Sequence, residues 1–284
     1  MPRVVSRKTA PTAPLPRPPG AVAPAKRRGE QPTLQGSETR GATVATGTRD
    51  EGIAKILAPA LATGEGARIL IYGRTRWGKS TFACDAIAAA VEAGVADVAL
   101  IHDPKYPDRS QYPGPRGDPW PAVSDPAQLG PAIKTAPIVV LRPPFSASDA
   151  AKVARALSEV GIRTMLVMDE TRRALGGQQL WADAKAEDGS PGAKSFEWLS
   201  LEGGGVGASL VLLVQRPRQL PGDATDSAQV HVVFGLGGRS LSYLVDQGTV
   251  PRDAADTVRR LQPGAFVVLA DDEEWDRKVY YSPL

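Results

Sequence analysis

The sequence predicts an α/β fold in which a mostly parallel sheet is covered by helices on both faces. Three observations support this prediction. Short apolar runs of strand length alternate with longer helical segments, as in chains built from strand-helix-strand units. Hydrophobic residues make up 42% of the 284 residues, which is enough for one sizeable core. Apolar runs such as 139–141 and 210–214 are typical of strands made to be buried.

Taken in order, the elements begin with a short helix and a strand and then alternate. The predicted strands are 67–72, 98–102, 138–141, 164–168, 209–214, 230–234, 266–270 and 278–281. The predicted helices are 51–63, a helix that ends at about residue 93, 147–160 and a segment around 196–202. A Pro-rich connection at 106–121 precedes the third strand, and we find no internal repeat.

Residues 1 to 49 differ in composition from the rest of the chain. They hold nine Lys or Arg, two acidic residues and eight prolines, whereas 50–284 hold 25 basic and 29 acidic residues. Such a segment cannot bury enough apolar surface to offset its ordering entropy, so we predict a disordered basic tail before a domain at 50–284. The tail suits a flexible arm that binds nucleic acid or a partner, and a solubilising extension is the alternative.

Several classes of protein are disfavoured. The apolar runs fall far short of the roughly 20 residues that a membrane-spanning helix needs, so we expect no membrane insertion. The N-terminus has charges and prolines but no apolar segment of the kind found in signal peptides. The single cysteine, Cys84, excludes an internal disulfide. We therefore expect a cytoplasmic protein.

The strongest chemical signal is the segment Gly-Arg-Thr-Arg-Trp-Gly-Lys-Ser at 73–80, a full match to G-x-x-x-x-G-K-[ST]. It lies between a predicted strand and a predicted helix, where backbone N–H groups and the helix N-terminus favour phosphate oxygens. Lys79 is expected to reach the β- and γ-phosphates of ATP, Ser80 to bind Mg²⁺ and Thr81 to bond a phosphate oxygen. An ordinary glycine turn is the structural alternative. The predicted nucleotide-binding residues are Gly73, Arg74, Thr75, Arg76, Trp77, Gly78, Lys79, Ser80 and Thr81.

A second signal is the apolar strand 164–168, which ends in Asp169 and Glu170. A carboxylate at this position can hold Mg²⁺ through water, while its neighbour orients and deprotonates the attacking water. We assign Asp169 to the metal and Glu170 to the water. Acidic residues also commonly follow strands without any such role, but two elements downstream of a full P-loop the pair predicts an ATP hydrolase. The strand between the P-loop and the pair distinguishes the chain from the simplest P-loop kinases.

Three further segments give the chain a resemblance to the FtsK/HerA superfamily of DNA-translocating ATPases, and in particular to the packaging ATPases of tectivirus-like, membrane-containing phages. His102-Asp103-Pro104-Lys105 resembles the Asp-Pro-Lys of FtsK-type motors, although Asp-Pro also starts ordinary turns. Gln215-Arg216-Pro217 is similar to a signature whose glutamine senses the γ-phosphate, and Gln215 could also be a polar strand-end residue. The segment 261–268 resembles the closing turn and strand. The resemblance covers roughly 66–282.

The resemblance implies an ASCE-type P-loop NTPase domain of RecA/FtsK-like fold. It further implies a ring, a hexamer, that couples ATP hydrolysis to movement of double-stranded DNA and loads a phage genome into a preformed capsid. Capsid or vertex proteins would then be partners, and the protein could be associated with the virion. Loops at 108–120 and 176–195 are candidates for the DNA channel. The chain departs from many relatives at 203–205, where three glycines replace a Gly-Arg pair, so the arginine that completes a neighbouring site has four candidates: Arg172, Arg173, Arg216 and Arg239.

Other readings stay open at this stage. A plasmid or chromosome segregation motor, a conjugation coupling protein or a filamentous-phage-type assembly ATPase would share the nucleotide site. So would a nucleotide-dependent switch with negligible turnover. Cys84, His102 and His231 are expected to be structural, because none has the spacing of a metal or nucleophile site. Tryptophans 120, 181, 198 and 275 are expected to be packing residues.

Overall fold

Ten strands form one mixed sheet in the computed structural model, which describes residues 44–104, 112, 119–169, 192–220, 222–270 and 275–282. The strands are β1 (Ala45–Thr48), β2 (Arg68–Tyr72), β3 (Val98–His102), β4 (Ala122–Val123), β5 (Ile138–Leu141), β6 (Thr164–Met168), β7 (Ser209–Val214), β8 (Val230–Phe234), β9 (Ala265–Ala270) and β10 (Lys278–Tyr281). Their order across the sheet is β1-β10-β9-β8-β2-β7-β6-β3-β5-β4. Neighbours from β8 to β4 are parallel, whereas β9 is antiparallel to both β8 and β10.

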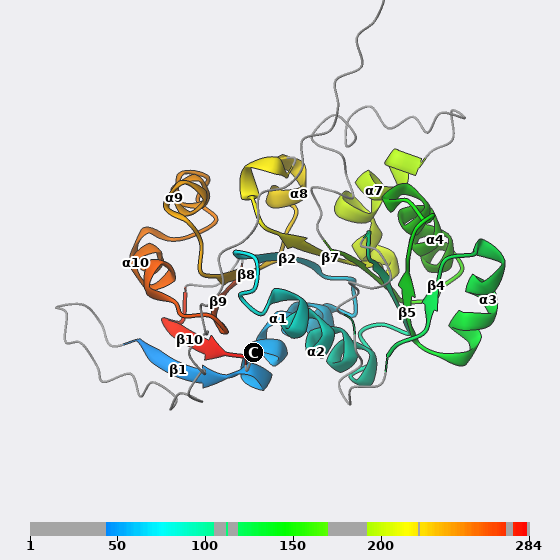
Figure 1. Ribbon diagram of the computed structural model, residues 1–284, viewed down its shortest axis with the longest axis horizontal. Helices are drawn as coiled ribbons and strands as arrows, with labels where there is room; N and C mark the ends of the chain where they lie inside the picture. Colours follow the sequence, from blue (N-terminus) through cyan, green and yellow to red (C-terminus); the bar gives the residue numbers. More distant parts are fainter. Residues whose placement is uncertain are drawn as a thin grey trace, which may run out of the picture. The chain divides into compact units, whose positions relative to one another are not determined.

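Helices cover both faces of this sheet. The helices are α1 (Arg49–Thr63), α2 (Lys79–Glu92), α3 (Pro126–Thr135), α4 (Ala147–Glu159), α7 (Gly192–Leu201), α8 (Gly222–Asp226), α9 (Gly238–Asp246) and α10 (Arg252–Arg260), with short 3-10 helices η2 (Gly203–Val206) and η3 (Pro217–Gln219). Figure 1 shows α1 and α2 on one side of the sheet and α4, α7, α8 and α9 on the other.

Alternation along the strands divides the core into two layers. Ile69 and Ile71 of β2 belong to the apolar cluster under α1 and α2, whereas Leu70 and Tyr72 belong to the cluster on the opposite face. Because successive side chains of a strand point to opposite faces, the apolar residues of β2 supply both layers. The predicted α/β fold with a mostly parallel sheet is confirmed.

The bounds of six predicted strands agree with the structure, and β2 and β9 differ from their predicted bounds by one residue. The elements that the sequence did not predict are β1, β4, α3, α8, α9 and α10. The two strands are short and carry no long apolar run, and α10 is a short helix in which charged residues outnumber apolar ones. Their positions depend on pairing and packing rather than on local sequence pattern.

The predicted boundary at residue 49 lies inside the folded part of the chain. Residues 45–48 form β1, which pairs in parallel with β10 in the register Ala45 to Lys278 and Thr48 to Tyr281. Composition could not show this, because Ala45–Thr48 has little apolar surface and is held by backbone pairing with the other end of the chain. Residues 1 to 43 of the predicted tail lie outside the described residues.

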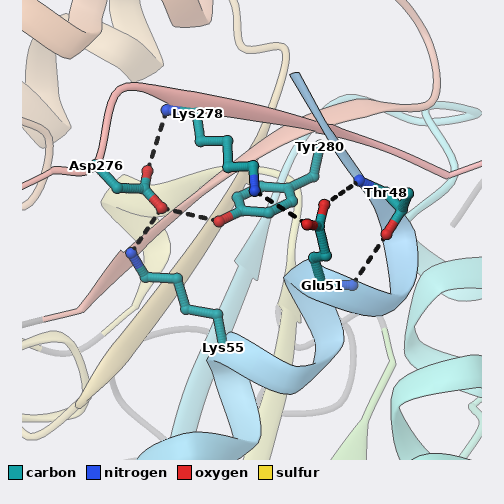
Figure 2. Close-up of polar contacts among 6 residues, drawn as sticks. All are labelled: Thr48, Glu51, Lys55, Asp276, Lys278 and Tyr280. Atoms are coloured by element: carbon teal, nitrogen blue, oxygen red, sulfur yellow. Dashed lines mark hydrogen bonds and ion pairs between the residues drawn. The ribbon is translucent and has the colours of Figure 1, made fainter. Parts of the chain in front are cut away.

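Polar contacts fasten the start of α1 to the strand β10 (Figure 2). Thr48 and Glu51 form a reciprocal capping box, in which each side chain accepts a hydrogen bond from the other's backbone N–H. Glu51 also accepts a hydrogen bond from Lys278 Nζ at 3.2 Å. On the next turn of α1, Lys55 Nζ lies 2.9 Å from Asp276 Oδ2, which accepts a second bond from the Tyr280 hydroxyl at 2.8 Å.

Among the described residues, no helix is long and apolar enough to cross a membrane.

Candidate nucleotide site

The predicted P-loop connects β2 to α2 at the carboxyl edge of the parallel strands. Gly78 immediately precedes α2 with φ at 93°, a left-handed conformation that favours glycine. Lys79 is the first residue of the helix, and its side chain is buried at 7% exposure. Its Nζ donates a hydrogen bond to the Arg74 carbonyl oxygen at 2.7 Å. The lysine ammonium group therefore lies over the loop itself, where a phosphate group would accept its hydrogen bonds.

Arg76 and Trp77 are two large residues of the P-loop, and their surroundings differ. Arg76 is exposed and has φ at 64°, which is uncommon for a residue with a side chain. Trp77 is half-buried and packs against both apolar clusters. A Cβ added to Gly235 would lie 1.9 Å from the Trp77 ring, so only glycine leaves room for the indole there. The large residue in the loop is thus matched by a glycine directly after β8.

One contact within the loop and two contacts to other segments fix its conformation, one to the segment after β8 and one to the turn before β9. The Arg74 guanidinium lies 5.5 Å from the centre of the Trp77 ring and donates to the Leu236 carbonyl at 3.1 Å. The backbone N–H of Gly264 donates to the Trp77 carbonyl at 3.3 Å. Gly264 belongs to the turn that resembles the closing element of FtsK/HerA proteins. The P-loop is therefore braced by two segments that are distant in sequence.

Asp169 follows β6 at the same edge of the sheet and is almost fully buried at 4% exposure. The backbone N–H of Asp169 donates to the His102 carbonyl at 3.2 Å. This hydrogen bond connects Asp169 to the end of β3, which the buried Asp103 follows. Burial, with the charges of Asp85 and Asp169, raises the pKa of Cys84 to about 12. Cys84 is one helical turn after Ser80 on α2. The Asp169 carboxylate is therefore close enough to α2 to influence the thiol of Cys84.

Gln215 follows β7, the strand between β2 and β6. The register pairs Tyr72 with Val214, so the P-loop and Gln215 begin side by side. Thr75 Oγ1 donates a hydrogen bond to Gln215 Oε1 at 3.1 Å. The structure thus brings together the P-loop, Gln215 and Asp169 at the ends of three adjacent parallel strands.

Tyr112 is a residue near the site that sequence reasoning did not identify. It comes from the Pro-rich connection between β3 and β4, and its side chain is buried at 4% exposure in the cluster under α1 and α2. Burial and the neighbouring Asp169 carboxylate raise the pKa of Tyr112 well above its ordinary value. Tyr112 is one of three aromatic residues in this Pro- and Gly-rich segment, so the sequence carried no signal that singled it out.

His102, His231 and Cys84, which the sequence predicts to be structural, are all buried. His102 Nε2 donates to the Phe145 carbonyl at 3.1 Å, and burial lowers the pKa of His102. Burial also lowers the pKa of His231 to about 4, and the ring stacks on Tyr72. The high pKa of Cys84 keeps its thiol protonated.

Several predicted residues lie outside the described part of the chain. They are Glu170, Lys105, Arg172, Arg173, Trp181 and most of the two candidate channel loops. Arg216 and Arg239 are described and exposed near the same edge of the sheet. The glycine run forms η2 at the amino end of β7, where a Cβ at Gly204 would lie 2.3 Å from a guanidinium nitrogen of Arg68.

No protein-family model and no curated protein matches this sequence. The fold is similar to that of B204, the genome-packaging NTPase of Sulfolobus turreted icosahedral virus 2. The B204 complex with ATPγS has 15% sequence identity and a TM-score of 0.56, with 77% of this chain and 97% of B204 covered. The complex with sulfate has 16% identity and a TM-score of 0.58, with 78% and 98% covered. The likeness confirms the predicted P-loop NTPase fold.

Proposed function

We propose that this protein is an ATP-driven double-stranded DNA translocase of the FtsK/HerA superfamily that loads a viral genome into a preformed capsid. The observation that carries the proposal is the strand order around the P-loop. Because β7 separates β2 from β6, Gln215 stands between the P-loop and Asp169 at one edge of the sheet. This arrangement supports an ATPase in which a sensor residue lies beside the terminal phosphate.

Within this site, Lys79 and the loop N–H groups are the proposed phosphate ligands. The residues proposed to bind Mg²⁺ are Ser80 and Asp169, since Mg²⁺ is usually held by one or two hard oxygen ligands together with water and substrate phosphates. The two residues fit that pattern, because each offers a hard oxygen atom and both lie at the carboxyl edge of the parallel strands, Ser80 in the first turn of α2 and Asp169 directly after β6. When bound, Mg²⁺ neutralises charge on the terminal phosphates.

The proposed hydrolytic step uses Glu170 as the general base. Its carboxylate accepts the proton of the attacking water as the oxygen of that water forms a bond to the γ-phosphorus. The bond between the γ-phosphorus and the β–γ bridging oxygen breaks in the same displacement, so that ADP leaves and inorganic phosphate is formed. Lys79 stabilises the charge on the γ-phosphate, and Gln215 reports whether that phosphate is present. Glu170 follows the buried Asp169 directly, which supports its position at the same strand end.

The proposed partners are double-stranded DNA, further copies of this chain in a hexameric ring, and capsid or vertex proteins. The packaging role is supported by the fold shared with B204, which is covered almost completely. In the ring, an arginine of one subunit completes the site of the next, with Arg216 and Arg239 as candidates that are exposed in this structure and Arg172 and Arg173 as the others. The basic tail would hold DNA or the capsid.

Steady-state ATP hydrolysis by the full chain, measured with and without double-stranded DNA, tests this proposal. We expect a saturable rise in rate with DNA and a higher specific activity at higher protein concentration, with Lys79→Ala as the inactive control. Hydrolysis at the same rate with and without DNA would reject the translocase. Tight ATP binding without turnover would indicate a nucleotide switch instead.

A further inference from the structure

Thr75 and Gln215 connect the P-loop to the strand that lies beside it. They are far apart in sequence, and both side chains are exposed at the edge of the sheet. The Thr75 hydroxyl group donates to Gln215 Oε1 at 3.1 Å. The backbones support the contact, because the Gly73 N–H donates to the Val214 carbonyl at 3.1 Å. The position of the two side chains thus follows from the pairing of β2 with β7.

The two ends of the Gln215 amide differ in chemistry. The oxygen accepts hydrogen bonds, and the NH₂ group only donates them. A phosphate oxygen of bound ATP accepts hydrogen bonds, so it can pair with the NH₂ group and is repelled by the amide oxygen. A glutamine that recognises a γ-phosphate by a direct hydrogen bond must therefore turn its NH₂ end toward that phosphate.

We infer that Thr75 is a positioning residue for Gln215, which holds the amide oxygen on the P-loop side and leaves the N–H donors for the γ-phosphate. The inference rests on the proposed function, in which Gln215 senses the γ-phosphate. Recognition of ATP over ADP then depends on a P-loop hydroxyl group that need not contact the nucleotide itself. Removing the hydroxyl group would let the amide rotate into the unproductive orientation.

The test compares the dissociation constants of the full-length protein for ATPγS and for ADP in the presence of Mg²⁺. Thr75→Val keeps the side-chain shape and removes the donor, while Thr75→Ser keeps the donor. Thr135→Val makes the same change in α3, where the hydroxyl group bonds only the backbone of its own helix. Gln215→Ala and the double variant Thr75→Val/Gln215→Ala complete a double-mutant cycle.

We expect Thr75→Val to weaken ATPγS binding roughly 3- to 10-fold relative to ADP, as the loss of one hydrogen bond predicts. Thr75→Ser and Thr135→Val should keep the wild-type ratio. The double variant should have the same ratio of ATPγS and ADP dissociation constants as Gln215→Ala, because both substitutions act through the Gln215 amide.

Equal weakening of ATPγS and ADP by Thr75→Val would overturn the inference, because it would indicate a deformed P-loop. Losses in discrimination that add in the double variant would overturn it as well. Both results leave ATP binding, and with it the proposed function, intact. A wild-type protein that binds neither nucleotide would instead reject the proposed function, and this inference with it.

Discussion

The Trp77 indole occupies the space in which any side chain at residue 235 would lie. A Cβ built on Gly235 would come within 1.9 Å of the ring, and the next two ring atoms would be 2.3 and 2.7 Å away. The two residues come from different strands, since Trp77 is in the loop after β2 and Gly235 follows β8. The conformation of the P-loop therefore depends on a backbone position that carries no phosphate ligand.

Gly235→Ala should force the indole to move and should weaken nucleotide binding in addition to destabilising the fold. Overpacking of this kind costs about 1–3 kcal/mol of unfolding free energy. Thermal unfolding and ATPγS titration of the same samples measure both effects. Gly238→Ala is the matched control, because a Cβ at Gly238 has no atom within 4 Å.

A double variant tests whether the clash with the indole causes the loss of stability. Trp77→Ala should partly rescue the stability of Gly235→Ala, because the clash disappears with the ring. Strictly additive losses in the double variant would show that the two residues act independently.

Lys79→Ala should weaken ATPγS binding by roughly 10- to 100-fold, because a charge-assisted contact to the terminal phosphates is lost. The same change at the exposed Lys134 of α3 should have no effect on binding. Titration of both variants with ATPγS gives the comparison. Full ATPase activity in Lys79→Ala would be incompatible with the P-loop assignment.

Glu170→Gln should bind ATP and Mg²⁺ but hydrolyse ATP roughly 10²- to 10⁴-fold more slowly, since the amide keeps the shape and loses the base. Single-turnover hydrolysis measured alongside ATPγS binding separates the two effects. Glu92→Gln at the end of α2 is an exposed control. If Glu170→Gln and Asp169→Asn both hydrolysed ATP at the wild-type rate, the pair would have no catalytic role.

Asp276→Asn should destabilise the fold at neutral pH and much less in acid. Burial raises the pKa of Asp276, but the hydrogen bonds from Lys55 and Tyr280 outweigh burial, so the pKa in the folded protein is below its ordinary value. A lowered folded pKa means that the contribution to stability is present above the unfolded pKa of about 4 and is lost as the pH falls through the folded value.

Urea unfolding at pH 7 should show a loss of about 0.5–1 kcal/mol for Asp276→Asn, because solvent screens this exposed group, and unfolding at pH 3 a smaller difference. Asp226→Asn, at an exposed position at the end of α8, should match the wild type at both pH values. A difference that stays constant between the two pH values would show that the charge of Asp276 does not stabilise the fold.

Two N-terminal deletions should behave differently. Removal of residues 1–42 takes away eight basic residues and should weaken DNA binding and its dependence on salt, with folding and basal ATPase activity retained. Removal of 1–49 also deletes β1 and the Thr48 cap of α1, a loss of about 1 kcal/mol or more. Only the longer deletion should lower the melting temperature. If the shorter deletion bound DNA with the same affinity and the same salt dependence as the full-length protein, the tail would serve only to keep the protein in solution.

The sequence by itself determined the central strands and the residues that follow them. Predominantly apolar runs such as 98–102 and 164–168 are typical of strands that are buried on both faces, so local pattern was sufficient to place them. The residues that follow such strands must lie at the carboxyl edge of a parallel sheet. This is why the P-loop and Asp169 could be predicted at one edge of the sheet from local pattern, whereas Gln215 was assigned to the same site from the family resemblance.

Only the tertiary structure decided which distant residues support that site. Three relationships join segments that are separate in sequence. They are the space for Trp77 at Gly235, the hydrogen bond between Thr75 and Gln215, and the burial of Tyr112 beside Asp169. The pairing of β1 with β10 likewise decided where the fold begins. Side-chain contacts of this kind leave no periodic pattern in the sequence, because they depend on which strands become neighbours, and strand order is set by packing of the whole chain.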